Sequence, residues 1–504
     1  MRILLINVVC GIRSTGRICT DLAKALEAQG HTVKIAYGRE SVPEFAQKYA
    51  VRIGTDADVR LHALKARLND GCGFGSRRAT ERFLKWVRAY DPDVIHLHNL
   101  HGYYIHVGLL FDYLRSCGKK IIWTLHDCWP FTGHSAYCEG AGCERFTDGC
   151  HDCPALREYP AALTDRSKRN WLRKKEIFQN VLDMTLITPS VWLKGLAERS
   201  FLSGYPVKVI PNGIDTERFH PSANDTKPFF GIQNALVVCD YDRLPKGSVQ
   251  AANRLAAELK ENGTLLMLGA GEVPDGLDAR AVQTASPKER DMLLAAADAI
   301  WDPAAPDPDA QICRILERLR AARNEQTEAS AKDTAGFWHD RAAYGLCGKR
   351  IVLGVASLWN ERKGVGDMIA LARSLRGKVR TVVVGVSDAQ IPAFPAGSLC
   401  VKETDDVETL RRLYAMADAY VNPTYEDNYP TTNLEAVACG TVVLTYRAGG
   451  SPESAMGSGP VFDVGDVDGM RRYLETFTDA KTHADPSATD GKRAVEAYRK
   501  EYGG

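Results

Sequence analysis

The segment Pro423–Glu453, PTYEDNYPTTNLEAVACGTVVLTYRAGGSPE, carries the pattern that determines the fold. A polar loop with two carboxylates leads into the short apolar segment NLEAVACG, and the continuous apolar run VVLTY follows at once. A short helix followed by a fully apolar strand is typical of a parallel sheet that helices cover on both faces. The stretch therefore indicates an α/β protein whose ligand sites lie at the carboxyl ends of its strands.

The amino-terminal part of the chain shows the same alternation. We expect strands at Arg2–Val8, His31–Tyr37, Asp93–His98 and Lys120–Leu125, and a helix at Thr20–Gln29. Apolar strands that alternate with helices predict a Rossmann-like parallel sheet. We assign this first domain to residues 1–215, where a Pro-Asn-Gly turn marks the crossing to the next domain.

Residues 336–504 are predicted to form a second Rossmann-like domain, and residues 225–332 interrupt the plan. The interrupting segment parallels the second domain: NALVVCDYDRLPKGS resembles RIVLGVASLWNERKGV, and LAAADAIWDP resembles YAMADAYVNP. We interpret it as an inserted partial duplicate of a Rossmann-like domain, with chance similarity as the alternative. Because the insert has no counterpart of the acidic loop, we expect it to be non-catalytic.

Composition excludes several classes of protein. Lys and Arg (64) nearly balance Asp and Glu (63), which argues against a nucleic-acid-binding protein. No apolar run reaches the roughly 18–20 residues that a membrane span needs. The first residues, MRILLINVVCGIRSTG, fit a strand and a glycine-rich loop better than a signal peptide. We therefore expect a cytoplasmic protein.

Three carboxylates in the opening segment are candidate site residues. Asp427 and Glu435 lie eight positions apart across a loop that enters a helix, and Glu426 directly precedes the first of them. Asn428 and Thr431 lie in the same loop, and we expect them to contact the same ligand. The alternative is an acidic surface loop that binds nothing.

A second candidate site is the triplet Arg362-Lys363-Gly364, which follows a predicted strand and precedes a predicted helix. A diphosphate carries concentrated negative charge, and two cations beside a helix N-terminus supply charge-assisted donors and the positive end of the helix dipole. A solvated pair of loop charges is the alternative.

The order of the motifs resembles one enzyme family. GIRSTG follows the first strand, DVIHLHNLHGYY contains the third and IIWTLHDCWPFTGH the fourth; VIPNGID, ERKG and EDNYPTTNLEAVACGT come later. This series is similar to that of retaining GT-B glycosyltransferases of the family 4 or group 1 type, as in colanic-acid, capsule and exopolysaccharide biosynthesis. The resemblance covers the chain outside roughly 225–332, and it implies two Rossmann-like domains facing a cleft.

The resemblance also implies roles on the donor side. A nucleotide-diphosphate sugar would be the donor, with its diphosphate held by Arg362 and Lys363 and its ribose by Glu435. The family signature is Glu-x7-Glu, and this chain departs from it because Asp427 stands at the first position. Either Asp427 or Glu426 would therefore bind hydroxyls of the donor sugar. The two cations would neutralise the leaving diphosphate, so we expect no catalytic metal.

Other implied roles fall in the first domain. Gly11 and Gly16 would let the backbone approach the donor. His126 would lie near the reacting centre, and Asp127 would orient its ring or contact a sugar hydroxyl. The histidines of HLHNLH are expected to be structural or to contact the acceptor. The leaving phosphate would accept the proton of the acceptor, so no separate general base is implied.

Four cysteines form a cluster in a glycine-rich loop: Cys138, Cys143, Cys150 and Cys153. Four thiolates suffice for a closed tetrahedral zinc site, which would be structural because it leaves no open position for catalysis. Free thiols and disulfides are the alternatives.

The segment Asp165–Phe178, DRSKRNWLRKKEIF, predicts a basic helix with an aromatic stripe. Such a helix can lie on an anionic bilayer, or it can place its apolar face on the protein core. Lipid-linked saccharides are usual acceptors in surface-polysaccharide synthesis, so the first reading implies peripheral contact with the inner face of the cell membrane.

Two other functions remain alternatives to a glycosyltransferase. One is a GT-B sugar-nucleotide epimerase, which needs no separate acceptor. The other is a non-catalytic binding or scaffold protein that retains the fold.

Overall fold

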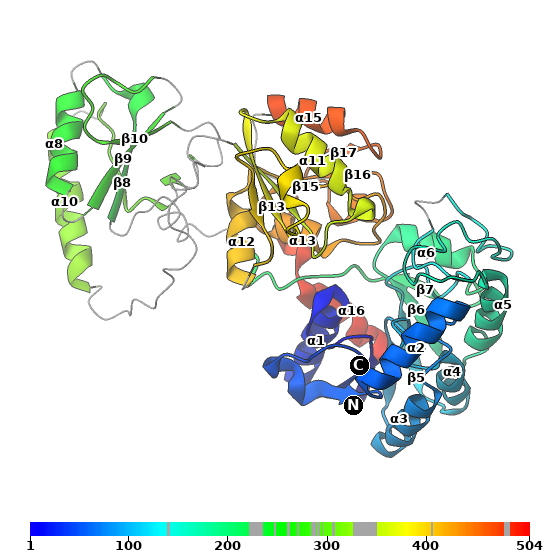
Figure 1. Cartoon of the computed structure of the whole chain (residues 1–504). Helices are drawn as coiled ribbons and strands as arrows, with labels where there is room; N and C mark the ends of the chain where they lie inside the picture. Colours follow the sequence, from blue (N-terminus) through cyan, green and yellow to red (C-terminus); the bar gives the residue numbers. More distant parts are fainter. Residues whose placement is uncertain are drawn as a thin grey trace.

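The structure, a computed structural model, describes residues 1–504 except 139–141, 221–234, 246–247, 260–262, 270–271, 284–289, 291–292, 295, 305–307, 326–349, 405–406, 478–483 and 504. Its strands form three sheets in which every pair of neighbours is parallel (Figure 1). The predicted α/β class, with its parallel sheets, is confirmed.

The first sheet has seven strands in the order β3-β2-β1-β4-β5-β6-β7. These are β1 (Arg2–Ile6), β2 (Thr32–Tyr37), β3 (Ala50–Arg52), β4 (Val94–Leu97), β5 (Lys120–Thr124), β6 (Met184–Thr188) and β7 (Val207–Val209). The strands predicted from apolar runs are β1, β2, β4 and β5. Successive residues of β1 pack into two different buried clusters, because helices cover both faces of the sheet.

The covering helices of this sheet are α1 (Arg13–Ala28), α2 (Asp56–Asn69), α3 (Arg77–Tyr90), α4 (Val107–Ser116), α5 (Ser167–Phe178) and α6 (Val191–Glu198). Helix α1 begins earlier than the predicted Thr20, so Gly16 lies inside the helix rather than in a loop. The turn before it depends on Gly11, whose φ of +77° favours glycine.

The second large sheet has six strands in the order β14-β13-β12-β15-β16-β17. These are β12 (Arg350–Val355), β13 (Val379–Val384), β14 (Leu399–Val401), β15 (Ala419–Asn422), β16 (Val442–Tyr446) and β17 (Val461–Phe462). Its helices are α11 (Val365–Ser374), α12 (Val407–Met416), α13 (Thr431–Ala438), α14 (Ser451–Ser454) and α15 (Val467–Thr476). The loops after β12 and β15 leave the carboxyl edge of this sheet next to each other, since the two strands are paired.

A four-stranded sheet lies between the two large sheets in the sequence, in the order β10-β9-β8-β11. It consists of β8 (Ala235–Asp240), β9 (Gly263–Gly269), β10 (Arg280–Gln283) and β11 (Ala299–Ile300). Helices α8 (Val249–Leu259) and α10 (Pro308–Glu325) bury one of its faces. The order matches that of β14-β13-β12-β15, strand for strand, as a partial duplication would produce.

The chain returns to the first domain after completing the second. Helix α16 (Gly491–Tyr502) packs on the first sheet, where Tyr498 and Tyr502 join the buried cluster of β1 (Figure 1). The hydroxyl of Tyr502 lies 2.7 Å from His96 Nδ1, and that of Tyr498 lies 3.0 Å from Thr124 Oγ1. Part of the segment 336–504 therefore belongs physically to the amino-terminal domain.

Candidate functional site

The acidic loop and the basic triplet meet at the carboxyl ends of β15 and β12. Lys363 forms an ion pair with Asp427, and Arg362 donates to the backbone oxygen of Glu426 over 2.6 Å. The amide of Tyr425 donates in turn to the oxygen of Arg362 over 2.9 Å. The structure thus gathers two cations and two carboxylates that lie 64 positions apart in the sequence.

Gly364 makes this close approach feasible. Its φ is +71°, and a Cβ atom at this position would lie 2.0 Å from the oxygen of Pro423. A side chain would therefore push the basic turn away from the acidic loop.

Glu435 lies on α13 and is buried. Its carboxylate accepts a hydrogen bond from the Tyr414 hydroxyl over 2.9 Å. Burial raises the pKa of Glu435 to about 7, while the Tyr414 hydroxyl and the charge of Arg17 on α1 oppose the increase. Thr431 begins the same helix directly after the acidic loop and is partly exposed.

Asn428 connects the two domains. Its side-chain oxygen accepts from Ser190 Oγ over 2.7 Å, and its side-chain nitrogen donates to the backbone oxygen of His126 over 3.1 Å. Nearby, the Glu453 carboxylate accepts from the first two backbone amides of α6, at 2.7 and 2.8 Å. The predicted donor loop therefore contacts the first domain at the residue expected near the reacting centre.

His126 follows β5 and pairs with another histidine. Its Nε2 lies 3.0 Å from His98 Nδ1. Burial lowers the pKa of His126 to about 4, which keeps the ring neutral at pH 7.

The sequence suggested that Asp127 orients the His126 ring, but in the structure its carboxylate has other partners. Its carboxylate binds His101 Nε2 over 2.7 Å and the amide of Trp129 over 3.0 Å. Burial acts to raise the pKa of Asp127, but the bonds from His101 and Trp129 outweigh it and the pKa lies below its usual value. His98, which follows β4, contacts the His126 ring instead, because β4 and β5 are neighbours in the sheet.

Gly11 and Gly16 adjoin each other at the start of α1. The Gly11 amide donates to the Gly16 oxygen over 3.2 Å, and a Cβ on Gly16 would approach Val9 and the Gly11 nitrogen within 3.4 Å. The glycines thus serve at least to close this turn, and a role in donor binding stays a prediction.

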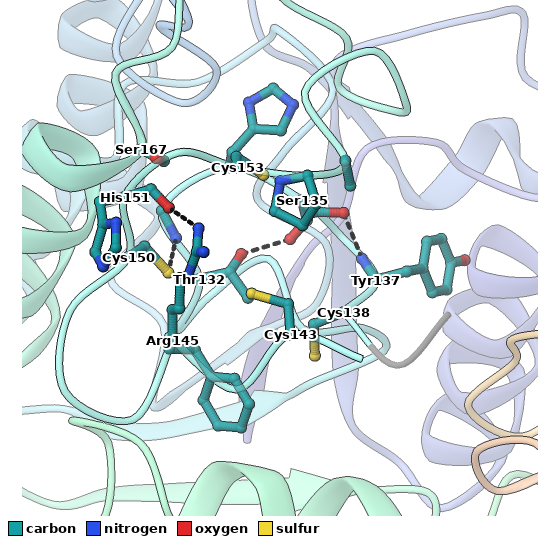
Figure 2. Close-up of a pocket in the computed structure, with 15 residues that line it drawn as sticks. Thr132, Ser135, Tyr137, Cys138, Cys143, Arg145, Cys150, His151, Cys153 and Ser167 are labelled. Carbon is teal, nitrogen blue, oxygen red and sulfur yellow. Dashed lines mark hydrogen bonds between the residues drawn. The ribbon is translucent and has the colours of Figure 1, made fainter. Parts of the chain in front are cut away.

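The four clustered cysteines all line one small cavity in the loop between β5 and α5 (Figure 2). All four are free thiols. Within the described ranges, no group of three or more Cys, His, Asp or Glu side chains lies close enough together to form a metal site. The neighbouring Cys138 thiol, together with burial, raises the pKa of Cys128, which lies outside the cluster.

Helix α5 places its aromatic side chains in the protein core. Trp171 and Phe178 are buried, and so is Lys174, whose ammonium donates to the backbone oxygens of Trp129 and Thr132 at 2.6 and 3.0 Å. This packing favours the core-facing reading of the basic helix. No described helix has the length and hydropathy needed to cross a bilayer.

Sequence reasoning missed Tyr137, which lies beside the first clustered cysteine. The Arg362 guanidinium stands 4.3 Å from the centre of the Tyr137 ring, within the range of a cation–π interaction. No local pattern signals this contact, since it joins two domains.

Comparison with known proteins gives a family match in each of the two large domains. Residues 15–218 match the family named Glycosyltransferase Family 4, and residues 349–478 match the family named Glycosyl transferases group 1. The chain is 30% identical over 234 residues to WcaC of Escherichia coli (strain K12). That protein is named as a glycosyl transferase of colanic acid biosynthesis. The match covers 43% of this chain and 55% of that protein, so the chain spans about half the length of its curated relative.

Solved structures share the fold. Sucrose-phosphate synthase from Thermosynechococcus elongatus has a TM-score of 0.52 at 15% identity, covering 99% of this chain and 94% of that one. An α,α-trehalose-phosphate synthase from Burkholderia xenovorans has a TM-score of 0.51 at 10% identity, covering 100% of both chains. One family match thus lies on each side of the inserted sheet, a glycosyltransferase family 4 match first and a glycosyl transferases group 1 match second, and the solved structures share the fold of the whole chain.

Proposed function

We propose that this chain transfers a sugar, with retention, from a nucleotide diphosphate to a saccharide acceptor in surface-polysaccharide synthesis. The observation that carries the proposal is the meeting of Arg362 and Lys363 with the acidic loop at the carboxyl edge of the second sheet. The family matches support the reaction class, and the relative named for colanic acid biosynthesis supports the polysaccharide context.

The proposed donor site uses the two cations for the diphosphate. Charge-assisted donors at a strand end can stabilise negative charge as it develops on the leaving group. When a diphosphate binds, Lys363 exchanges its contact with Asp427 for the phosphate oxygens. The freed Asp427 carboxylate, with Glu426 beside it, is then available to hydroxyls of the donor sugar.

Glu435 is proposed to accept hydrogen bonds from the ribose. Tyr414 fixes one side of the carboxylate. Thr431, at the start of α13, and Asn428, in the acidic loop, complete the proposed donor contacts. Gly11 and Gly16 bring the start of α1 towards the donor, in line with the effect of Arg17 on Glu435.

On the acceptor side, the neutral His126 ring is proposed to lie near the anomeric carbon. His98 holds its Nε2 atom, and Asn428 holds its backbone oxygen. The departing phosphate accepts the acceptor hydroxyl proton, so the proposal assigns no general base to the protein. Charge neutralisation is assigned to Arg362 and Lys363 rather than to a catalytic metal.

We further propose a lipid-linked acceptor. Because the aromatic residues of α5 are buried, membrane contact would be electrostatic and would use the exposed Lys168, Arg169 and Lys175. This would place the protein at the inner membrane face without insertion. Binding to vesicles of anionic lipid, compared with neutral vesicles, tests this part of the proposal.

The test of the donor site is calorimetric titration with UDP and with GDP. We expect one of the two nucleotides to bind, and the Arg362→Ala/Lys363→Ala double variant to lose that binding. An Arg376→Ala/Lys378→Ala variant, altered on exposed cations of the same domain, should bind as the parent does. Failure of the folded parent to bind either nucleotide would contradict the donor assignment and favour a scaffold.

Turnover separates a transferase from the alternatives. The nucleotide that binds identifies the set of sugar donors to assay, with and without saccharide acceptors. Release of nucleotide that requires an acceptor supports transfer. Interconversion of the nucleotide sugar without an acceptor would instead show an epimerase.

A further inference from the structure

The cysteine loop encloses a cavity that fits a single ion. Its volume is about 30 Å³, and the thiols of Cys143, Cys150 and Cys153 are among its lining groups (Figure 2). About 10–15 Å³ suffices to hold one water molecule, so the space is large enough for one ion.

A buried histidine with one unused nitrogen lines the same cavity. The side chain of His134 is fully shielded from solvent, and its Nε2 atom has no hydrogen-bond partner among the residues that the structure describes. Its Nδ1 atom lies 2.5 Å from Asp70 Oδ1. An imidazole that bonds a carboxylate through one nitrogen and keeps the other free is the arrangement found behind metal-binding histidines.

The surroundings also hold the thiols in place. The Gly133 amide donates to Cys150 Sγ over 3.2 Å, a contact that stabilises sulfur as it gains negative charge. Arg145 clamps the turn between the last two cysteines by donating to the oxygens of His151 and Asp152, both at 2.7 Å. The Cys153 amide is fixed by Asp165 over 2.7 Å.

We propose that His134, Cys143, Cys150 and Cys153 bind one structural zinc ion. Three thiolates and one imidazole form a closed tetrahedral set, which leaves no position for substrate. The set leaves out Cys138, whose thiol neighbours that of Cys128 and raises the pKa of that residue. The described side chains do not lie at coordination distances, so binding would draw the thiols inward around the ion.

Binding is a proton-coupled step. Each of the three thiols loses its proton to solvent as its sulfur forms a bond to Zn²⁺, while His134 coordinates through the lone pair of Nε2 and keeps the proton on Nδ1 against Asp70. No oxidant or reductant takes part. The bound loop would hold Tyr137, and through its ring the Arg362 guanidinium, in one position.

The test measures metal content in the full chain, purified without chelators or metal-affinity columns. We expect about one zinc ion per chain by elemental analysis, and a tetrahedral thiolate spectrum after exchange with Co²⁺. Cys143→Ser, Cys150→Ser and Cys153→Ser should each lose the metal and the spectrum. Cys138→Ser and Cys400→Ser are matched controls that should retain both.

The histidine is tested separately. His134→Gln should lose tetrahedral Co²⁺ binding; should that variant fail to fold, Asp70→Asn should weaken Co²⁺ affinity by roughly 10–100-fold. Background metal content and no Co²⁺ uptake in the parent would overturn the proposal. So would loss of metal in Cys138→Ser with retention in His134→Gln. These readouts need no nucleotide sugar, so they stand apart from the proposed transferase activity.

Discussion

Individual residues at the second sheet are positioned by constraints that act at atomic distances. Gly364 has room only for a hydrogen atom beside Pro423, and Glu435 keeps a carboxyl group away from water. Both features cost folding free energy, because an exposed carboxylate and an unstrained turn would each give a more stable fold. They therefore mark the site more sharply than charge alone does.

Glu435→Gln should change stability in a pH-dependent way. The pKa of Glu435 is raised from 4.5 to about 7, which corresponds to on the order of 3 kcal/mol. A raised carboxyl pKa contributes stability fully below pH 4.5, and this contribution is lost as the pH rises to about 7. The variant should therefore gain in melting temperature over the parent as the pH increases from 4.5 to 7, with a constant gain above.

Thermal unfolding at a series of pH values measures this effect. Glu403→Gln, at an exposed position of the same domain, should show no such trend. A gain for Glu435→Gln that does not vary with pH would contradict the burial of a titrating carboxyl. The same variant should bind the nucleotide less tightly, since it loses a charged acceptor for the ribose.

Gly364→Ala should separate the basic turn from the acidic loop. The clash with the Pro423 oxygen and the positive φ should destabilise the domain by about 1–3 kcal/mol and weaken nucleotide binding. Gly366→Ala is the matched control: it lies in α11 with open space around its Cβ, and should stabilise by roughly 0.5–1 kcal/mol. Denaturant unfolding and calorimetry compare the two, and equal effects would refute the close contact.

Helices and strands could be predicted where the sequence pattern that produces them is local. Contacts between elements distant in the sequence could not. The strands β1, β2, β4 and β5 were predicted because continuous apolar runs reflect burial on both faces. The start of α1 was missed because Gly16 sits inside the helix, against its usual preference. The acidic loop and the basic triplet were found because both follow strands. The pairing of His126 with His98, and of Asp127 with His101, depends on strand neighbours that no local pattern reveals.

The loop between β5 and α5 reaches the second domain through Tyr137. Tyr137→Ala should weaken nucleotide binding by about 2–5-fold, the equivalent of roughly 0.5–1 kcal/mol for a cation–π contact. Tyr137→Phe keeps the ring and should bind as the parent does. Calorimetry on the two variants separates a contribution of the ring from one of the hydroxyl, since an effect of equal size in both would implicate the hydroxyl instead.

The first and second domains are joined by more than one set of contacts. Asn428 and Glu453 hold the second domain against α6, and helix α16 lies on the first sheet. The inserted sheet repeats the strand order of the second domain, which a local comparison of motifs suggested but could not establish. This shared strand order is what a partial duplication would produce.

Removal of residues 491–504 should destabilise the first domain rather than the second. Tyr498 and Tyr502 fill the space beside β1, and both hydroxyls contact buried polar groups of β4 and β5. Hydrogen exchange should therefore accelerate in β1, β4 and β5, with little change in β15 and β16. Deletion of only residues 503–504 is the control, and unchanged exchange in the first sheet of the longer deletion would contradict the packing of α16.

Helix α16 also has a consequence for how the protein is made. His96 and its partner Tyr502 are 406 residues apart, so the ribosome must add all of them before that contact can form. Domains commonly fold in order as they leave the ribosome, the first one earliest. Here the first sheet emerges early, and the apolar side chains that α16 will cover stay exposed until the second domain has been synthesised. During that interval a nascent chain would offer a binding surface to chaperones, and any premature stop would leave it exposed.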